Sequence, residues 1–417
     1  MPESADSYYD RQEVRSPAER ERALFHALPG LLRHALDNAP LYRARYGDID
    51  PAAFTDRAAL ARLPVLRKEE LPELQEREPP FGGLAATPFD RLGRVFASPG
   101  PIFEPQGNRA DYWRMARAMF AAGFRCGDLV HNTFAYHLTP AGFMIDSGAR
   151  ALRCPVFPGG TGQTELQLGA ISRLRPVAYA GTPSFLGILL EKAEETGTAP
   201  LSFEKALVSG EAFPPSLRDR LAENHGIDAY QCYATADAGL IAYESPAREG
   251  LIVDEAVLLE IVRPGGDEPL PEGEVGEVVV TVFNPDYPLI RFGTGDLSAV
   301  MPGRSPCGRT NLRIRGWMGR ADQTTKVRGM FVHPRQVQEI VGRFDAILEA
   351  RLEVEEVDGR DRMILRCETA AVADEGLRAS VAEAVRAVTG LRGEVELVPP
   401  GSLPNDGKVI DDRRRRG

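Results

Sequence analysis

A glycine-containing loop near residue 100 lies where nucleotide enzymes often bind phosphate. Residues 96–107 read FASPGPIFEPQG, between a strand-like stretch and a predicted helix. Loops in this position cradle phosphate with backbone N–H groups. Here, however, there is one serine and no threonine or lysine, and Pro99, Pro101 and Pro105 remove three N–H donors. The sequence therefore predicts a loop in the right place for phosphate but with a weak grip on it.

Three further loops carry polar residues that suit a nucleotide. GTGD, residues 293–296, follows an apolar strand, and its aspartate can accept hydrogen bonds from both hydroxyls of a ribose. An Asx turn capping a hairpin is the alternative for such a turn. SGEA, residues 209–212, has a glycine that lets the backbone approach a purine, and Tyr233 in YATADAG can stack on the base. A tyrosine buried in the core is the alternative for Tyr233.

The elements around these loops alternate between strand and helix. We predict strands at 128–130, 154–157, 177–180 and 205–208, each followed by a helix, at 141–149, 163–174, 184–196 and 216–224. This order predicts a parallel sheet that helices cover on both faces, with the ligand-binding loops at one edge. Upstream, Ser16-Pro17-Ala18-Glu19 predicts a capped helix, and residues 109–122 predict a second.

The pattern changes twice after residue 250. Period-two alternation predicts antiparallel strands at 256–262 and 277–283. From residue 320 onward, a helix at 333–342, strands at 348–354 and 363–367, a helix at 375–388 and a strand at 394–397 predict a small α/β domain. The fold class is therefore α/β. We expect a large domain over 1–319, with a helical start (1–90), an α/β core (91–250) and a β-rich part (251–319), and a small mobile domain over 320–417.

The composition argues against some classes of binding partner and favours one cellular compartment. The net charge of −10 argues against nucleic acid, and no apolar run is long enough for a membrane span. The polar N-terminus has no signal-peptide core, and five scattered cysteines fit reduced thiols better than disulfides. We expect a cytoplasmic protein that binds neither nucleic acid nor membrane.

Several segments, in order, resemble the phenylacetate–CoA ligase family, a branch of the adenylate-forming enzymes. They are LLRHALDNAPLYRARYG with LPVLRKEEL, AGTPSFL, VSGEAFPPSLRDRL, PLIRFGTGDL, CGRTNLRIRGWMGRADQTTKVRGMFVHP and GSLPNDGKVID. The resemblance implies two half-reactions: ATP and an acid give an acyl-adenylate, and a thiol then displaces AMP. The implied cofactors are ATP/AMP, Mg²⁺ and coenzyme A, and the implied partners are an aromatic carboxylic acid and CoA or a carrier-protein thiol. It also suggests a homodimer.

The resemblance assigns roles to particular residues. Asp296 and Arg320 would bind the ribose, and Asp322 would be the hinge about which the last domain turns. Lys408 would be the catalytic lysine of adenylation, stabilising charge shared by the carboxylate and the α-phosphate. A charged linker and an ordinary surface lysine are the alternatives for the last two. The remaining implied nucleotide-binding residues are Ser209, Gly210, Glu211, Ala212, Tyr230, Tyr233 and Lys326.

Two motifs of the family are altered. Most relatives carry YG-x-T-E, in which threonine touches the α-phosphate and glutamate holds Mg²⁺, whereas residues 233–237 read YATAD. Asp237 keeps a carboxylate suited to Mg²⁺, and Thr235 would replace the hydroxyl that Ala236 lacks if the register shifts by one. The usual loop SSGTTGxP reads SPGPIFEP, in which Glu104 would repel a polyphosphate.

Compensation for the altered loop would come from Arg109, Arg114 or Mg²⁺. Many relatives also have a cysteine/histidine cluster near the stretch YESPAREGLIVDE, which here contains neither residue type. Only Cys307 remains, so we predict no zinc.

The stretch HNTFAYHLTPAGFMID is the candidate acyl pocket. Tyr136 and Phe143 would flank an aromatic ring, Gly142 and Gly239 would leave room for it, and His137 is a candidate polar contact. Ala236 belongs to the same predicted set. Plain core packing is the alternative for these aromatic residues.

Two functional hypotheses follow. The first is an ATP-dependent aryl-acid–CoA ligase, which the retention of Asp296, Arg320 and Lys408 favours. The second is a degenerate relative that binds an acyl-adenylate or acyl-thioester, or transfers a pre-activated acyl group, without adenylation. The altered phosphate loop favours the second. No positive feature favours a regulatory or scaffold protein.

Overall fold

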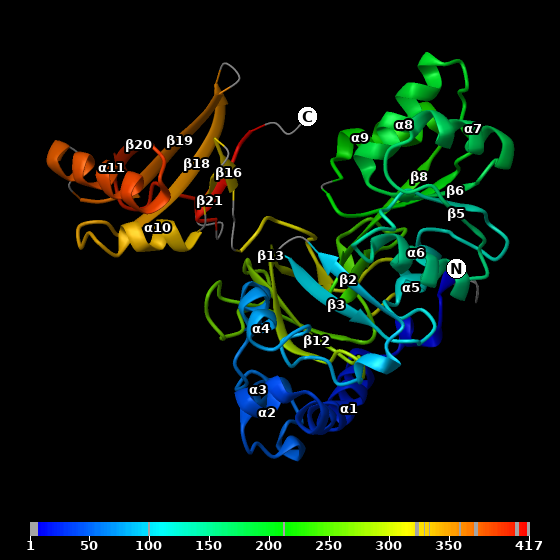
Figure 1. Ribbon diagram of the computed structural model, residues 1–417, viewed down its shortest axis with the longest axis horizontal. Helices are drawn as coiled ribbons and strands as arrows, with labels where there is room; N and C mark the ends of the chain where they lie inside the picture. Colours follow the sequence, from blue (N-terminus) through cyan, green and yellow to red (C-terminus); the bar gives the residue numbers. More distant parts are fainter. Residues whose placement is uncertain are drawn as a thin grey trace.

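The computed structural model describes residues 7–98, 101–211, 213–321, 325–328, 330–332, 334–357, 360–370, 374–404 and 408–414. It shows a large body and, beside it, a smaller sheet-and-helix unit formed by the end of the chain (Figure 1). The fold is α/β, as the sequence predicts. Within the described residues, no helix combines the length and apolar character needed to cross a membrane.

A nine-stranded sheet forms the upper part of the large body. Its order is β14-β15-β10-β9-β8-β7-β6-β4-β5, and β5, β4, β6, β7 and β8 run parallel. These strands are β4 (Val130–Asn132), β5 (Val156–Pro158), β6 (Ala178–Gly181), β7 (Lys205–Val208) and β8 (Asp228–Thr235). The helices between them are α6 (Ala141–Ala151), α7 (Thr164–Leu174), α8 (Pro183–Glu195) and α9 (Pro215–His225).

Side-chain alternation along these strands explains the two covered faces. Ala178 and Leu207 join the core cluster that includes α6, whereas Tyr179 and Val208 join the cluster beneath α7 and α8. Successive residues of a strand point to opposite faces, so a strand buried on both sides must be apolar throughout. Strand β6 meets this requirement, whereas β4 buries the polar side chains of His131 and Asn132, which form hydrogen bonds with Gln167 and with the Tyr136 hydroxyl.

Antiparallel strands continue this sheet beyond β8. They are β9 (Gly239–Glu244), β10 (Leu251–Val253), β15 (Arg313–Ile314) and β14 (Val300–Met301). A tight turn, residues 236–238, joins β8 to β9 at the carboxyl end of the parallel strands. That end is the ligand-binding edge of such sheets.

A second sheet lies in the lower part of the body (Figure 1). Its order is β1-β13-β12-β11, with β11 (Val257–Val262), β12 (Gly276–Val282) and β13 (Leu289–Ser298) antiparallel. The short strand β1 (Leu66–Arg67) pairs in parallel with β13, with Arg67 opposite Gly293. The residue after β1, Lys68, is thereby brought alongside the middle of β13.

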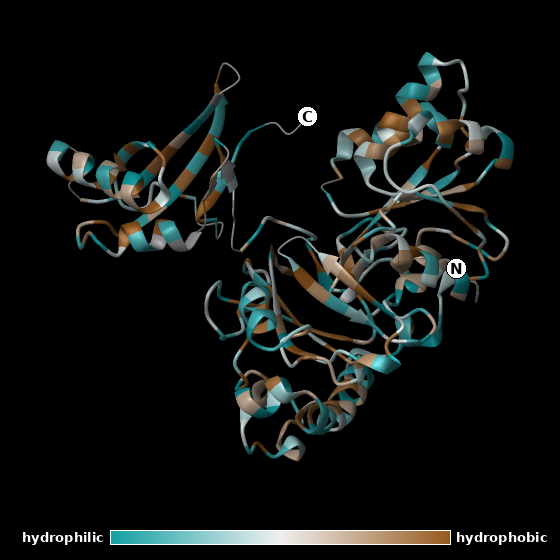
Figure 2. Ribbon diagram, viewed as in Figure 1, coloured by the Kyte–Doolittle hydropathy of each residue, from teal (hydrophilic) through white to brown (hydrophobic). Residues whose placement is uncertain are grey.

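The N-terminal helices pack against this second sheet in one core cluster. They are α1 (Pro17–Asn38), α2 (Pro40–Tyr46), α3 (Arg57–Leu60) and α4 (Leu71–Arg77). Helix α1 begins with the predicted capping box, in which the Ser16 hydroxyl accepts from the Glu19 N–H and the Glu19 carboxylate accepts from Ser16. In Figure 2, hydrophobic residues gather along the strands of the sheets, whereas the helices alternate with hydrophilic residues.

The proline-containing loop belongs to a hairpin of β2 (Arg94–Ser98) and β3 (Ile102–Gln106). Helix α5 (Met115–Ala121) follows, and it begins later than the predicted residue 109. The reason is a turn: Asp111 and Arg114 have positive φ angles of 44° and 64°, which an α-helix does not accommodate. The Asp111 carboxylate accepts a hydrogen bond from the Ala116 N–H, at 3.0 Å, inside the new first turn.

The last part of the chain forms its own sheet and core cluster. The sheet order is β20-β19-β18-β21, covered by α10 (Pro334–Val341) and α11 (Glu375–Thr389). The strands are β18 (Glu349–Val357), β19 (Arg360–Glu368), β20 (Glu394–Val398) and β21 (Ile410–Asp412), preceded by a hairpin of β16 (Thr325–Val327) and β17 (Met330–Val332). The domain boundary near residue 320 stays a prediction, since residues 322–324 lie outside the described residues.

Candidate active site

An ion pair between Lys68 and Asp237 lies at the ligand-binding edge of the nine-stranded sheet. Lys68 follows β1, Asp237 sits in the turn between β8 and β9, and Lys68 Nζ is 2.6 Å from Asp237 Oδ2. The Asp237 side chain has no exposed surface. Burial alone would lower the pKa of Lys68, but the charge of Asp237 and its hydrogen bond outweigh burial and raise it. This lysine is therefore a fixed cation.

Glu104 comes from the hairpin to the same place. Because side chains alternate along β3, Phe103 faces outward whereas Glu104 faces inward and is only 2% exposed. Its Oε1 accepts a hydrogen bond from the Ser98 hydroxyl. Burial, followed by the charge of Asp237, raises the pKa of Glu104 to about 8, although Lys68 opposes the shift. The repulsion of phosphate by Glu104 stays a prediction, and the fold adds Lys68, whose charge acts on Glu104.

Asp296, the predicted ribose ligand, is held by three side chains. Its Oδ2 accepts from the Tyr233 hydroxyl at 2.8 Å, and its Oδ1 accepts from Trp317 Nε1 at 3.1 Å and from Arg320 Nη1 at 3.2 Å. Gly295, with φ of 75°, lets the arginine approach, since a Cβ there would lie 2.8 Å from Arg320 Nη2. Three of the predicted nucleotide-binding residues, Tyr233, Asp296 and Arg320, are thus brought together.

The SGE loop after β7 lies at the same edge of the parallel strands. The Ser209 hydroxyl donates to the Cys232 carbonyl at 2.8 Å, and Gly210 has a φ of 87° that favours glycine. Glu211 accepts a hydrogen bond from the Ser184 N–H at 2.9 Å, near the start of α8. Their part in an adenine slot stays a prediction, and Ala212 lies outside the described residues.

Tyr230 and Thr235 use their hydroxyls within the protein. Tyr230 donates to Asp228 Oδ2 at 2.9 Å and the Arg248 guanidinium lies 5.1 Å above its ring, so these contacts point away from the Tyr233–Asp296 group. Thr235 Oγ1 accepts from the Ala238 N–H at 3.0 Å and so closes the turn that carries Asp237. The Thr235 hydroxyl hydrogen stays available for a phosphate oxygen.

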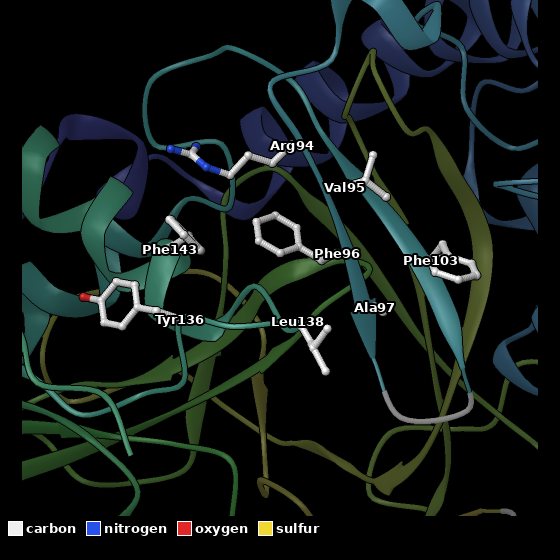
Figure 3. A pocket seen from close by; sticks show the side chains of 8 residues that line it. All are labelled: Arg94, Val95, Phe96, Ala97, Phe103, Tyr136, Leu138 and Phe143. Atoms are coloured by element: carbon white, nitrogen blue, oxygen red, sulfur yellow. The ribbon is translucent and has the colours of Figure 1, made fainter. Parts of the chain in front are cut away.

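An aromatic cavity of about 520 Å³ opens beside the β2–β3 hairpin (Figure 3). The Phe143 ring lies 5.4 Å from that of Tyr136 and 5.5 Å from that of Phe96, and the Arg94 guanidinium is 4.6 Å above Phe143. The Tyr136 hydroxyl is engaged elsewhere, donating to Asp146 Oδ1 at 2.7 Å. The cavity can therefore take a flat apolar group with a cation at its rim. Its lining is Arg94, Val95, Phe96, Ala97, Phe103, Tyr136, Leu138 and Phe143.

The room predicted at Gly142 and Gly239 is filled by the protein itself. A Cβ at Gly142 would lie 2.8 Å from the Ala135 carbonyl oxygen, and one at Gly239 would lie 2.9 Å from that of Trp113. Glycine allows a close approach at both positions, by the Ala135 carbonyl and the Tyr136 ring at Gly142 and by Trp113 at Gly239. His137 is exposed and lies outside the cavity lining, and Ala236 is half-buried in the β8–β9 turn.

Lys408 belongs to the C-terminal unit. Its Nζ donates to Asp411 Oδ1 at 3.3 Å, just ahead of β21. Lys326 lies in β16, and Asp322 lies outside the described residues. The roles of these residues stay predictions.

The place of the zinc cluster of relatives is filled by ion pairs. Glu244 pairs with Arg218 at 2.9 Å, and Cys307 Sγ lies 3.6 Å from Arg309 Nη1. In the part of the chain that the structure describes, no group of three histidine, cysteine or acidic residues is placed to hold a metal.

Three residues of this candidate site were not identified from the sequence: Lys68, Trp317 and, in its observed orientation, Glu104. Lys68 and Trp317 both stand in segments that carry the family resemblance, LPVLRKEEL and CGRTNLRIRGWMGRADQTTKVRGMFVHP. That membership is the signal that would have marked them for inspection.

Comparisons with known proteins agree with this geometry. Residues 137–282 match the AMP-binding enzyme family and residues 329–413 match the AMP-binding enzyme C-terminal domain. A phenylacetate-coenzyme A ligase of Thermus thermophilus is 31% identical, over 93% of this chain and 94% of that protein. One of Escherichia coli K12 is 27% identical, over 96% of each.

Solved structures give the same picture. A 2-hydroxyisobutyryl-CoA ligase in complex with 2-HIB-AMP and CoA has a TM-score of 0.73 and 27% identity, covering 99% of this chain and 95% of that one. The same ligase in its postadenylation state has a TM-score of 0.74 and 28% identity, over 99% and 94%. Both sequence and fold are matched over nearly their whole length, and the chain therefore belongs to the phenylacetate–coenzyme A ligase family.

Proposed function

We propose that the chain is an AMP-forming acid–CoA ligase that activates an aromatic carboxylic acid. An acid oxygen attacks the α-phosphorus of ATP, the bond to the β-phosphate oxygen breaks, and pyrophosphate leaves. The thiol of CoA then attacks the acyl carbonyl and AMP leaves. The relatives named phenylacetate-coenzyme A ligase and the related ligase in complex with an acyl-AMP and CoA support this proposal.

The observation that carries the proposal is the anchoring of Asp296. Tyr233 comes from β8, Trp317 and Arg320 come from the segment after β15, and all three converge on its carboxylate. A carboxylate held so firmly is preorganised to accept ribose hydroxyls, and exchanging the Tyr233 hydroxyl for a ribose hydroxyl would leave its hydrogen-bond count unchanged. The Tyr233 ring then lies next to the base.

Lys68 supplies the cation that phosphate binding requires. The hairpin has prolines where backbone amides would be needed, so the triphosphate must be held by other groups. Lys68 stands beside Asp237 and is kept charged by it. On arrival of ATP, its ammonium can exchange the carboxylate for phosphate oxygens and so stabilise the charge of the departing pyrophosphate.

Asp237 fits the magnesium ion that accompanies ATP. Its Oδ1 is buried and has no hydrogen-bond partner among the described residues, so it is free to act as a ligand. Magnesium bound there would neutralise phosphate charge. Thr235, two residues before Asp237, would orient a phosphate oxygen by donating its hydroxyl hydrogen to it.

The aromatic cavity supports an aryl acid as substrate. Phe96, Phe143 and Tyr136 offer ring faces and edges to a flat apolar group, and Arg94 would attract its carboxylate during entry. We propose that the C-terminal unit rotates near Asp322 between the two half-reactions. Lys408 would lie at the site for adenylation and would leave it before the thioester forms. CoA is the proposed acceptor, and a carrier-protein thiol is the alternative acceptor.

One assay distinguishes this proposal from a degenerate binder. The protein is supplied with ATP, Mg²⁺ and a panel of aryl acids, and acid-dependent release of pyrophosphate and formation of acyl-CoA are followed. Turnover with at least one acid supports the ligase. Tight binding of acyl-AMP without turnover of any acid would favour the degenerate relative. Light scattering on the purified protein tests whether it forms a homodimer.

A further inference from the structure

Three buried oxygens near Lys68 lack hydrogen-bond partners among the described residues. They are Asp237 Oδ1, Glu104 Oε2 and the Tyr287 hydroxyl. Glu104 is 2% exposed, Asp237 5% and Tyr287 1%, so bulk solvent does not reach these side chains. An unpaired buried polar atom destabilises the folded state unless a group from outside the chain pairs with it. Three in one place indicate a site built for a group that is not part of the protein.

These oxygens belong to one electrostatic neighbourhood. Burial raises the pKa of Tyr287 well above its ordinary value, and the charges of Asp237 and then Glu104 raise it further. The charge of Asp237 also raises the pKa of Glu104. Lys68 pairs with Oδ2 of Asp237 only, so Asp237 Oδ1 and Glu104 Oε2 both stay without a partner among the described residues. A cation that prefers oxygen ligands suits both of these oxygens.

A hard divalent cation has both properties. Mg²⁺ in nucleotide enzymes is held by one or two carboxylates and completes its shell with substrate phosphates and water. Two carboxylates from separate segments, each with a free oxygen, match that ligand set. The absence of a third acidic, cysteine or histidine residue from the described surroundings fits a cation that arrives with a nucleotide rather than a permanent structural metal.

The hairpin explains why Glu104 is available for this role. Phe103 and Ala97 face one side of the hairpin, and Glu104, Phe96 and Ser98 face the other. The Ser98 hydroxyl donates a hydrogen bond to Glu104 Oε1 and so fixes the orientation of the carboxyl group. Glu104 Oε2 then has no hydrogen-bond partner among the described residues. The strand that bears the prolines thus contributes a carboxylate where related loops contribute amides and hydroxyls.

We propose that Glu104 is a second protein ligand, together with Asp237, of the divalent cation that accompanies the nucleotide. The chain would then hold the β- and γ-phosphates through a metal bridge and Lys68, in place of backbone amides. The inference rests on the proposed function in one respect, which is that ATP is the nucleotide. Binding of the metal can be measured without turnover.

The test is Mn²⁺ binding by electron paramagnetic resonance, in which the signal of free Mn²⁺ falls as the ion binds. The full chain is titrated with Mn²⁺ and AMP-PNP in the absence of any acid, so that the nucleotide is not consumed, and a titration without protein gives the Mn²⁺ that the nucleotide binds alone. We expect Glu104→Gln and Asp237→Asn each to weaken Mn²⁺ binding about tenfold or more, by analogy with the loss of supporting metal contacts. The binding of AMP without metal, measured by calorimetry, should be unchanged in Glu104→Gln.

Controls separate ligation from folding and from surface charge. Glu76→Gln removes an exposed carboxylate on α4 and should leave Mn²⁺ affinity unchanged. If Glu104→Gln does not fold, judged by its thermal transition, Glu104→Met tests the same loss. Mn²⁺ affinity that is equal or tighter in the neutral variant, or no binding of Mn²⁺ with AMP-PNP by the parent protein, would overturn the inference. Metal binding without turnover of any acid would instead contradict the proposed ligase activity alone.

Discussion

Lys68 and Asp237 are 169 positions apart in the sequence, and their charged atoms meet at 2.6 Å. The contact depends on the pairing of β1 with β13, which sets the residue after β1 beside the turn between β8 and β9. The hairpin that should hold phosphate is depleted of N–H donors. The second sheet brings a lysine close to it, and we propose that this lysine takes the place of the missing donors.

Loss of this lysine should impair adenylation selectively. Lys68→Met keeps the length of the side chain but removes the charge, leaving Asp237 buried and unpaired. We expect kcat/KM for ATP to fall about 100-fold, the scale for loss of one preorganised charge contact. Acid-dependent pyrophosphate release measures this step. Thioester formation from supplied acyl-AMP should change little, and Lys192→Met, an exposed lysine on α8, serves as the control. Equal losses in both half-reactions would contradict the assignment.

Asp296 should govern nucleotide affinity. Asp296→Asn leaves one oxygen to accept from Trp317 or Arg320 but removes the negative charge that the Arg320 guanidinium and the ribose hydroxyls would use. We expect the dissociation constant for AMP, measured by calorimetry, to rise about 10-fold to 100-fold, which corresponds to the 1.5–3 kcal/mol of a charged hydrogen bond. The affinity for free CoA should stay within a factor of about two. An unchanged AMP affinity would exclude Asp296 from the ribose site.

Lys408 should matter in only one half-reaction. Its ion pair with Asp411 lies in the C-terminal unit, so its proposed action on ATP requires movement of that unit. Lys408→Ala is expected to lower acid-dependent pyrophosphate release by about 100-fold or more. Thioester formation from supplied acyl-AMP and CoA should stay near the parent rate. A comparable loss in thioester formation would show that the lysine has a different role.

Local sequence signals predicted most of the elements and few of the contacts between them. The sequence predicted the helix cap formed by Ser16 and Glu19, the alternating strands and helices, and the C-terminal α/β unit. Each of these depends on residues that are neighbours in the sequence. Lys68 was not recognised as a site residue, because its position depends on a two-residue strand pairing with β13, more than 200 residues away.

The glycine and glutamate positions show the same limit of sequence reasoning. Gly142 and Gly239 are predicted from the sequence to leave room for an aromatic ring, but a sequence does not tell whether protein or substrate fills the space beside a glycine. Glu104 was judged by its charge alone, whereas the hairpin decides which face it occupies and therefore which charges surround it. The predicted helix at 109–122 failed at its start because Arg114 takes a left-handed conformation that periodicity does not reveal.

Asp111 should make stability depend on pH. Burial raises its pKa from the ordinary 3.8 to about 6, against the hydrogen bonds from Ala116 and Met115. A carboxyl group with a raised pKa in the folded state stabilises below its ordinary pKa, and this stability is lost as pH rises through the folded value. Between pH 4 and 6 the free energy of unfolding should therefore fall by at most about 3 kcal/mol from this group.

The variant Asp111→Asn isolates this contribution. It keeps an oxygen that accepts from the Ala116 N–H but cannot ionise, so its thermal transition temperature should change less between pH 4 and 6 and exceed that of the parent at pH 7. Asp219→Asn, at an exposed position, should follow the parent curve. Parallel curves for parent and Asp111→Asn across this range would contradict the prediction.

The buried pair of Arg291 and Glu260 should dominate the stability of the second sheet. Arg291 has no exposed side-chain surface, its Nε lies 3.0 Å from Glu260 Oε2, and it also donates to the carbonyls of Ala61 and Asp267. Glu260→Gln would leave this guanidinium without its counter-charge. The expected loss is about 3–5 kcal/mol, the cost of breaking a buried pair on one side. Scanning calorimetry should show a lowered transition temperature, whereas Glu268→Gln, exposed near the same strand, should shift it little.

The double variant Glu260→Leu/Arg291→Met tests the physical reason. With both charges gone, no unpaired charge is buried, so part of the stability lost in Glu260→Gln should return. Recovery should be incomplete, because the carbonyls of Ala61, Leu63 and Asp267 lose the donors that Arg291 supplies. A double variant less stable than Glu260→Gln would show that those carbonyl hydrogen bonds, and not the ion pair, carry the contribution of Arg291.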